Sequence, residues 1–254
     1  MGDAGKRIVE ELLPDFIKEN KIDFVIAQAE NIADGKSPKP KDIRDMQKVG
    51  VNFFTGGNHS FTNKQTKPLH EDPSIPLTRP ANVDDKEGSG WKIIDYKGVK
   101  IFIASILGQT VGARRVEITN PLHKIDEILG TIDDSVKVRI VNFHGDFSSE
   151  KRVFGYYLDG RVSAVLGDHW HVPTADAMIL PEGTAHITDV GMCGSLHSSL
   201  GVKTDVIVDR WKTGQQSRNK LEEDGTMQFN AVIVDIDQTT GLARSIEHIQ
   251  KLVH

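Results

Sequence analysis

The sequence has almost no cysteine and no long apolar run, and each shortage excludes a class of protein. A single cysteine, Cys193, rules out a disulfide within the chain and is typical of a reducing compartment. No stretch approaches the roughly 18 consecutive apolar residues that a membrane-spanning helix needs, and the first residues lack the apolar segment of a signal peptide. We therefore expect a cytoplasmic protein.

Blocks of like charge are also missing. The 254 residues carry a net charge of −5, and 38% of them are hydrophobic and 26% charged. This balance is ordinary for a globular protein and gives no general attraction to nucleic acid or to anionic membranes. We expect neither duplex DNA nor a membrane among the partners. Because the chain shows no internal repeat, low-complexity tract or linker, the sequence favours one domain over residues 1–254.

Short apolar runs alternate with helical periods, a pattern typical of an α/β fold with parallel strands. Predicted strands cover 22–29, 51–54, 136–143, 162–167, 185–190, 229–236 and 243–250, and 91–96 with 99–105 form a hairpin around Lys97-Gly98. Predicted helices cover 6–19, weakened by Pro14, then 40–48, 121–129, 150–158 after the N-cap candidates Ser148 and Ser149, and 205–212. The composition of residues 62–88 is typical of a long surface loop.

The most informative stretch is residues 162–171, which read VSAVLGDHWH. An apolar run ends at Gly167, and His169 and His171 follow with one residue between them. In an extended chain, residues at i and i+2 point to the same side, so both imidazoles would project from the carboxyl end of a strand. Such a pair suits a divalent metal, but two partly exposed loop histidines explain this stretch equally well.

Other predicted strands also end in residues that can bind a metal. These are Glu30 and Asn31 after the strand at 22–29, Asn58 and His59 after the strand at 51–54, and His144 after the strand at 136–143. Because the carboxyl ends of parallel strands open on one crevice, all of these side chains would converge there. One carboxylate, asparagine carbonyls and three imidazoles can hold two divalent ions, and paired ions stabilise both the attacking and the leaving oxygen of phosphoryl transfer. The recurrence favours a metal site over coincidence.

Residues beside these histidines carry weaker hypotheses. Asp146 and Asp168 adjoin His144 and His169, and they are candidates either to orient the imidazoles or to cap loops. Trp170 can narrow the site or offer a face on which a base stacks. Four other histidines follow no such pattern and are expected to lie in solvent: His70, His123, His248 and His254.

Six segments, in order along the chain, carry a resemblance to a known family. They read AEN (29–31), GGNH (56–59), FHGDFSSEK (143–151), YLDGRVSAVLGDHWHVPTAD (157–176), LPEGTAHITDVGMCG (180–194) and VIVDIDQTTGLARSIEHI (232–249). With these segments the chain closely resembles the YmdB-like family of calcineurin-like metallophosphoesterases, from Gly2 to about Gln250. The GNH and HxH pieces are shared across the superfamily, whereas the long run at 157–176 is specific to the family.

The resemblance implies an α/β sandwich of two mixed β-sheets flanked by helices, with a di-metal site that cleaves phosphodiesters, 2′,3′-cyclic nucleotides among them. The metals would be iron or manganese, with zinc as a further candidate, and the family also implies a homo-oligomer. The positions that match its motifs are Glu30 as the bridging carboxylate, Asn58, His144 and His169 as ligands of one metal, His171 as a ligand of the other, Asn31 close to the site, and His59 as the group that protonates the leaving oxygen.

One ligand implied by the resemblance is missing. Family members begin with a short apolar strand that ends in Gly-Asp, whose aspartate binds the same metal as His171, and this strand would fall before the first residue of the sequence. The turn that follows it aligns with residues 2–6, so Asp3 is not that ligand. Either the recorded start is too late or the protein lacks the strand, and we favour the first.

Two functional hypotheses follow. The first is a di-metal-dependent phosphodiesterase that hydrolyses cyclic nucleotides or short RNA phosphodiesters by a metal-bound hydroxide, with His59 as the general acid. The alternative is a catalytically impaired regulatory or scaffolding protein of the same fold, which the missing aspartate motivates. Metal content separates them, because the enzyme should hold about two ions per chain and its rival one or none.

Overall fold

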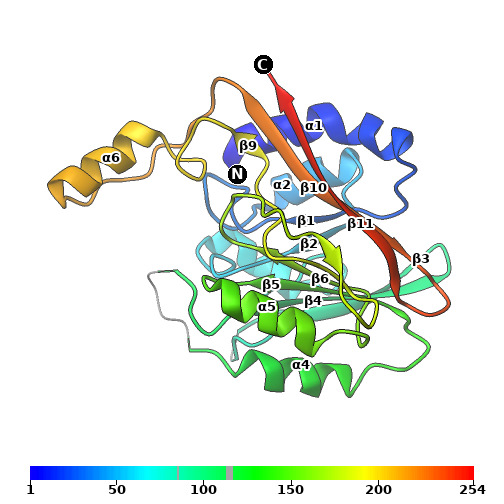
Figure 1. Ribbon diagram of the computed structural model, residues 1–254. Coiled ribbons are helices and arrows are strands. Elements are labelled where there is room, and N and C mark those ends of the chain that lie inside the picture. Colours follow the sequence, from blue (N-terminus) through cyan, green and yellow to red (C-terminus); the bar gives the residue numbers. More distant parts are fainter. Residues whose placement is uncertain (85, 113–116) are drawn as a thin grey trace.

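The computed structural model describes residues 1–84, 86–112 and 117–254, and its largest element is a six-stranded mixed sheet (Figure 1). Its strands, in spatial order, are β3 (Trp91–Tyr96), β4 (Val99–Leu107), β5 (Val138–His144), β6 (Ala164–Asp168), β8 (Ala185–Ile187) and β7 (Met178–Ile179). The four inner strands are parallel, and the two edge strands run antiparallel to their neighbours. The parallel strands therefore deliver their carboxyl ends to one side of the sheet.

A second β layer covers one face of this sheet (Figure 1). It consists of a parallel pair, β1 (Ile26–Gln28) with β2 (Phe53–Thr55), and an antiparallel sheet of β9 (Gly194–Ser195), β10 (Met227–Ile236) and β11 (Ala243–Val253). Apolar side chains from both layers meet between them, among them Phe53, Ile103 and Ala243. The two layers form the inside of a sandwich.

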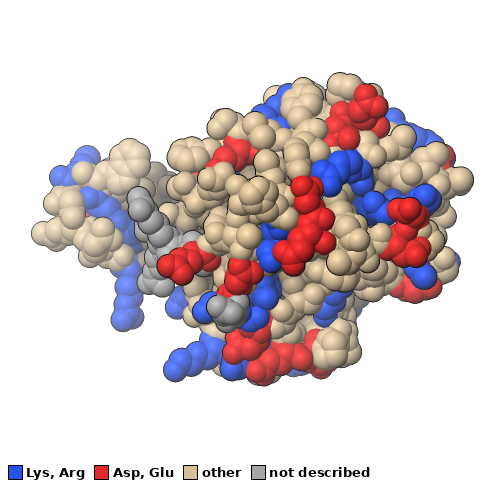
Figure 2. Space-filling model, turned by 90° about the horizontal axis from the view of Figure 1, so that it is seen from below, with Lys and Arg blue, Asp and Glu red and all other residues tan. Residues whose placement is uncertain are grey.

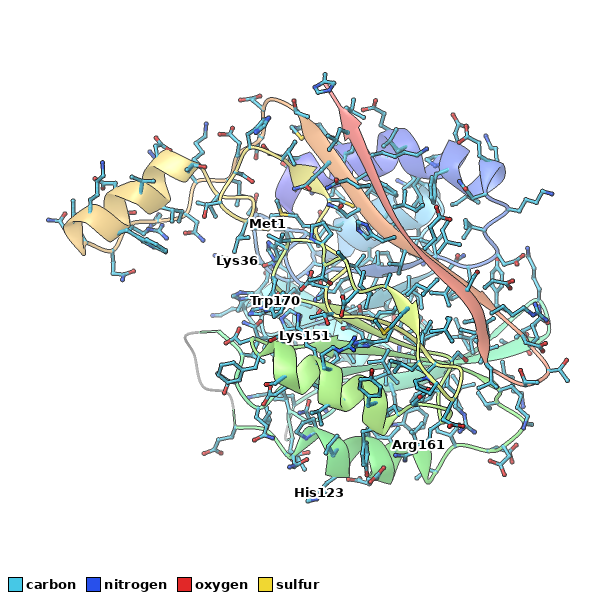
Figure 3. The ribbon with its side chains drawn as sticks, viewed as in Figure 1. Met1, Lys36, His123, Lys151, Arg161 and Trp170 are labelled. Carbon is cyan, nitrogen blue, oxygen red and sulfur yellow. The ribbon has the colours of Figure 1, made fainter. Side chains whose placement is uncertain are left out.

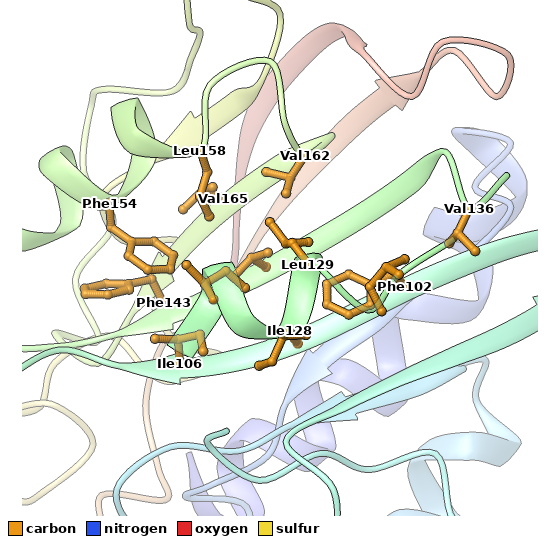
Figure 4. Packing of buried hydrophobic residues seen from close by; sticks show 14 residues of the cluster. Phe102, Ile106, Ile128, Leu129, Val136, Phe143, Phe154, Leu158, Val162 and Val165 are labelled. Atoms are coloured by element: carbon orange, nitrogen blue, oxygen red, sulfur yellow. The ribbon is translucent and has the colours of Figure 1, made fainter. Parts of the chain in front are cut away.

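Helices close both outer faces of the sandwich. The helix α1 (Gly2–Glu19) and the helix α2 (Pro40–Lys48) cover the second layer, and α4 (Pro121–Leu129) and α5 (Ser148–Tyr157) cover the six-stranded sheet. On the second of these faces, Ile125, Ile128 and Phe154 of the helices pack on Phe102 and Phe143 of the strands (Figure 4). Three apolar clusters thus separate four layers, which is the expected α/β class with mixed sheets between helices.

Further helices are η1 (Lys64–Thr66), α3 (Lys67–Glu71) and α6 (Thr204–Thr213). Leu69 of α3 joins the apolar cluster beneath α1 and α2. The helix α6 projects from the body of the molecule and has no buried residue (Figure 1). Within the described residues, every helix is too short or too polar to cross a lipid bilayer. Acidic and basic side chains alternate over the face formed by α4 and α5 (Figure 2), and pairs such as Arg161 with Asp126 lie on it.

The sequence predicted most of these elements. The helices at 40–48 and 121–129 and the hairpin strand at 91–96 have the expected bounds. The helix α1 begins at Gly2, earlier than expected, and its added turn is buried at Gly2, Ala4 and Gly5. It continues through Pro14 because its buried face, including Ile8 and Phe16, packs on the second layer and outweighs the hydrogen bond lost there. The N-cap prediction was wrong, since Ser148 is already helical and the cap is Phe147, without a side-chain hydrogen bond.

The segment at 62–88 was predicted as a loop but contains η1 and α3, and the two-residue strands β7 and β9 were missed. Two residues are too few to show any periodicity, so pairing with a neighbouring strand decides such an element. His70, which lies on α3 of this segment, was expected in solvent but is buried, with 7% exposure. The sequence pattern around His70 does not predict this burial.

Candidate metal centre

Glu30 lies at the middle of the cluster, two residues after the end of β1, and is 2% exposed. Its Oε1 accepts a hydrogen bond from Asn31 Nδ2 at 3.0 Å and lies 3.3 Å from His144 Nε2, while its Oε2 accepts from the backbone N–H of His59 at 3.0 Å. The backbone at Gly57 passes so close that an added Cβ would lie 2.2 Å from Glu30 Oε2. A side chain at this position would fill the space around the carboxylate.

His144 ends β5 and is held between two acceptors. Its Nε2 lies 2.7 Å from Asn58 Oδ1, and its Nδ1 lies 2.7 Å from Asp168 Oδ1. A carboxylate on one ring nitrogen orients the ring and leaves the other nitrogen to face a metal. Burial lowers the pKa of His144, but the carboxylates of Glu30 and Asp168 outweigh burial and raise the pKa to about 9.

His169 and His171 complete the group. His169 Nε2 lies 2.6 Å from Asp146 Oδ1, and its Nδ1 is buried without a hydrogen-bond partner among the described residues. His171 Nδ1 donates to the carbonyl of Leu200 at 3.1 Å, which leaves Nε2 to face Asn31 Nδ2 at 3.2 Å. Burial lowers the pKa of both imidazoles to about 4, so both are neutral near pH 7 and can bind a cation.

The residues fit a divalent metal. Candidate ligand atoms of Glu30, His144 and His169 all lie within 4.8 Å of one another. A carboxylate, an amide oxygen and imidazoles form a donor set that first-row divalent metals accept, and the unpaired His169 Nδ1 is the kind of buried atom that a ligand would satisfy. The structure places Asn31 and His171 beside this group and Asn58 within it, while His59 is half-buried next to Asn58.

His169 and His171 follow the carboxyl end of a strand, as predicted, but the expected extended backbone between them was wrong. The strand β6 ends at Asp168, and both histidines have positive φ, 100° at His169 and 63° at His171. Non-glycine residues rarely adopt this region, and backbones held there occur where the surrounding structure fixes them and are enriched at functional sites. The two imidazoles are therefore brought to the site by a bend and not by strand alternation.

A buried ion pair lies beneath this bend. Lys151 of α5 is fully buried and donates to Asp168 O and, at 3.0 Å, to Asp189 Oδ2. The same Asp189 oxygen accepts from the backbone N–H of Trp170 at 2.8 Å. The indole of Trp170 lies over the Lys151 ammonium at 4.1 Å and donates to Asp146 O at 2.9 Å (Figure 3). Asp168 and Trp170, the residues on either side of His169, thus both contact Lys151 of α5.

Sequence reasoning missed Lys151 and Asp189. The available signal is that Lys151 lies three residues before Phe154, on the face of α5 that packs on the sheet. A lysine on such a face needs a buried partner. Of the weaker hypotheses, the orienting contacts of Asp146 and Asp168 are present, and Trp170 fixes the bend through its own hydrogen bonds.

Comparisons with known proteins agree over nearly the whole chain. The model of a family described as YmdB-like protein matches residues 1–249. A 2′,3′-cyclic-nucleotide 2′-phosphodiesterase of Bacillus subtilis is 35% identical over 251 residues, which is 98% of this chain and 93% of that protein. The crystal structure of a phosphatase of Mycoplasma pneumoniae has a TM-score of 0.92 at 31% identity, covering 99% of this chain and 90% of that chain.

A more distant structure shares the fold alone. The 5′-nucleotidase precursor of Thermus thermophilus has a TM-score of 0.56 at 12% identity, and the match covers 96% of this chain but 48% of that chain. The expected α/β sandwich of β-sheets between helices is thereby confirmed as the fold.

Lys151→Met should destabilise the protein strongly, because it leaves the Asp189 carboxylate buried without its partner. Breaking a buried pair in this way costs about 3–5 kcal/mol. The free energy of unfolding, measured by urea denaturation, should fall by about that amount, and the double variant with Asp189→Asn should recover part of it. The matched control Lys41→Met removes an exposed lysine and should change stability little. Equal stability of Lys151→Met and the control would contradict a structural role for the pair.

Metal binding should release a proton from His144. A metal that approaches His144 Nε2 must displace its proton below about pH 9, where the raised pKa keeps the imidazole charged. The apparent metal affinity should therefore rise with pH, by up to tenfold per unit, and level off above about pH 9. Calorimetric titration of the metal-free protein with Mn²⁺ at pH 7, in buffers of different ionisation enthalpy, measures the proton directly. A heat that does not depend on the buffer would show that no proton is released.

Proposed function

The chain belongs to the YmdB-like protein family and is a phosphoesterase, and we propose that it hydrolyses phosphodiesters of cyclic nucleotides or short RNA ends at a centre of two divalent metals. The observation that supports this most is the convergence of Glu30, His144 and His169 at one point. Three separate strand ends supply these side chains. A carboxylate buried beside two imidazoles, one of which has a nitrogen without a hydrogen-bond partner among the described residues, suits metals that act on a phosphoryl group.

The proposed ligands divide into two groups. Asn58, His144 and His169 would hold one metal, His171 the other with Asn31 nearby, and Glu30 would lie between them. When bound, such ions activate water and neutralise charge on the phosphoryl oxygens. The metals proposed are iron or manganese, with zinc as a further candidate, because a histidine, asparagine and carboxylate set accepts all three.

Residues of the protein would donate the proton to the leaving oxygen and orient the ligand imidazoles. His59 follows the ligand Asn58, and its backbone N–H is anchored on Glu30. An imidazole at that place can donate a proton to the leaving oxygen. Asp146 and Asp168 each hold one nitrogen of a ligand imidazole and so fix its orientation before a substrate arrives. The Bacillus subtilis relative, named for 2′,3′-cyclic nucleotides, supports small nucleotides as the substrate class, and the single cysteine supports a cytoplasmic location.

His59→Ala should lose turnover in a way that depends on the leaving group. An alkoxide needs a proton as the bond breaks, so hydrolysis of adenosine 2′,3′-cyclic phosphate should fall by about 10²–10⁴-fold. An aryl oxide leaves more easily, so hydrolysis of bis-p-nitrophenyl phosphate should fall much less. Both rates are measured on manganese-loaded protein with the metal content of each sample determined.

The control His123→Ala changes an exposed histidine of α4. An equal loss on both substrates would remove His59 from proton transfer. Wild-type protein that holds metal but cleaves neither substrate would favour the impaired regulatory or scaffolding protein.

We also propose a homo-oligomer in which α6 packs against a second copy of the chain. This ten-residue helix buries no residue in one chain, and its Trp211 is 88% exposed. Isolated helices of this length are marginal in water, so α6 needs a packing partner to persist. Light scattering on a sizing column should give a mass above 28.1 kDa, and Trp211→Ser should shift it toward the monomer. A monomer at all concentrations would contradict the proposal.

A further inference from the structure

A cavity of about 420 Å³ lies beside the loop that carries the metal-centre residues Asn58 and His59. Its lining residues are Ser60, Phe61, Asn63, Lys64, Lys67 and His70 from one segment and Lys86 and Glu87 from another. The α-carbon of Phe61 is three peptide units from that of Asn58, so at most about 11 Å separates them. The volume falls within the range of small-molecule sites. The cavity lining and the metal-centre residues Asn58 and His59 therefore lie on one continuous loop.

Ser37 anchors the segment that forms one wall of the cavity. Asn63 N donates to Ser37 Oγ at 3.1 Å, and Thr66 Oγ1 donates to the carbonyl of Pro38 at 2.7 Å and lies 2.9 Å from Ser37 Oγ. Asn63 Oδ1 also caps η1 by accepting from the backbone N–H of Gln65 at 3.0 Å. Lys64 is therefore presented by a short helix that is anchored at both ends.

The opposite wall is built around Arg79. Its guanidinium donates to the carbonyls of Lys86 at 3.0 Å, Glu87 at 3.2 Å and Gly88 at 3.2 Å, as well as to that of Val83 at 2.9 Å. Such a set of charge-assisted bonds orders the segment without any secondary structure. The cavity is thus preformed on both sides.

The floor of the cavity is aromatic. The ring of Phe61, 36% exposed, lies 5.7 Å from that of His70, with an angle of 41° between the two planes. Burial lowers the pKa of His70, so this imidazole is neutral, and its Nε2 faces the carbonyl of Ser60 at 3.4 Å. Two buried polar atoms of lining residues, Ser60 Oγ and His70 Nδ1, have no partner within the described ranges. An exposed ring above neutral polar groups suits a flat heteroaromatic ligand.

The rim of the cavity is basic. Lys67 is paired with Glu87 at 2.7 Å and with Glu71 at 3.5 Å, while Lys64 and Lys86 are exposed at its edge. Three ammonium groups then face two carboxylates, which leaves an excess of positive charge beside an aromatic floor. Aromatic faces with flanking cations are the means by which proteins bind single nucleotides of any sequence.

We propose that this cavity binds the nucleoside next to the scissile phosphate, with its base stacked on Phe61 and its 5′-phosphate between Lys64 and Lys86. This inference rests on the proposed function, and it makes the end of an RNA strand a better substrate than a cyclic mononucleotide. Stacking tolerates every base, because each has a π face, so the site selects for a nucleotide and not for a sequence.

The test compares three substrates that differ by one group each. They are ribose 2′,3′-cyclic phosphate, adenosine 2′,3′-cyclic phosphate, and the latter with a 5′-phosphate. Wild-type kcat/KM should rise at both steps. Phe61→Leu keeps apolar bulk but loses the ring, and it should reduce the gain from the base by about 5- to 100-fold, which is the value of one stacked base. Phe61→Trp should keep that gain.

The matched control is Phe147→Leu, which removes an exposed ring outside the cavity. The second step is tested by Lys64→Met combined with Lys86→Met, which should abolish the gain from the 5′-phosphate while keeping the gain from the base. Raising the salt concentration should mimic this double variant in the wild type, because cation–phosphate contacts are screened. Lys97→Met, an exposed lysine of the β3–β4 turn, is its control.

The outcomes distinguish a failure of the nucleoside subsite from a failure of the proposed function. If the base-dependent gain is the same in wild type and Phe61→Leu, the subsite is wrong while the phosphodiesterase stands. If wild type turns over none of the three substrates, the proposed function fails, and calorimetric binding of adenosine 3′-monophosphate against ribose 3-phosphate still tests the cavity. Preferential binding of the adenosine compound that Phe61→Leu abolishes supports the subsite, and equal binding of both compounds overturns it.

Discussion

The burial of the Glu30 carboxylate is the constraint on which the rest of the site depends. At 2% exposure, a charged oxygen pair needs compensation from every direction, and the chain supplies the amide of Asn31, the backbone N–H of His59 and the imidazole of His144. These groups belong to three different strand ends, so one charge fixes how the two β layers meet. Gly57 follows from the same constraint, because any side chain there would collide with the carboxylate.

A second buried charge, the ammonium group of Lys151, holds the bend that carries the ligand histidines. The Lys151 ammonium is satisfied by Asp189, by Asp168 O and by the face of Trp170, and two of these residues, Asp168 and Trp170, flank the ligand His169. The positive φ values at His169 and His171 store conformational strain, and this network offsets it. The fold orients the imidazole ligands before a metal binds, because one nitrogen of each imidazole already has a hydrogen-bond partner.

The fold also holds the cavity beside the metal centre in a fixed shape before a substrate binds. Its walls are held by Ser37 and by Arg79, neither of which contacts the metal ligands, so its shape does not depend on metal. A site divided into a metal centre and a preformed nucleoside pocket can use binding energy away from the reacting phosphorus to position it. Substrates without a base or a second phosphate would forgo that contribution.

The sequence by itself determined the class of fold and the identity of the candidate ligands. Alternating apolar and helical periods predict the layers, and polar residues that recur after strands predict a shared edge, because both signals are local. Only the tertiary structure decided how those ligands are held. The bend at His169, the burial of Lys151 and the aromatic floor at Phe61 and His70 each depend on residues distant in the chain. Burial and pairing of charges are properties of the packed molecule, and no local pattern of residues contains them.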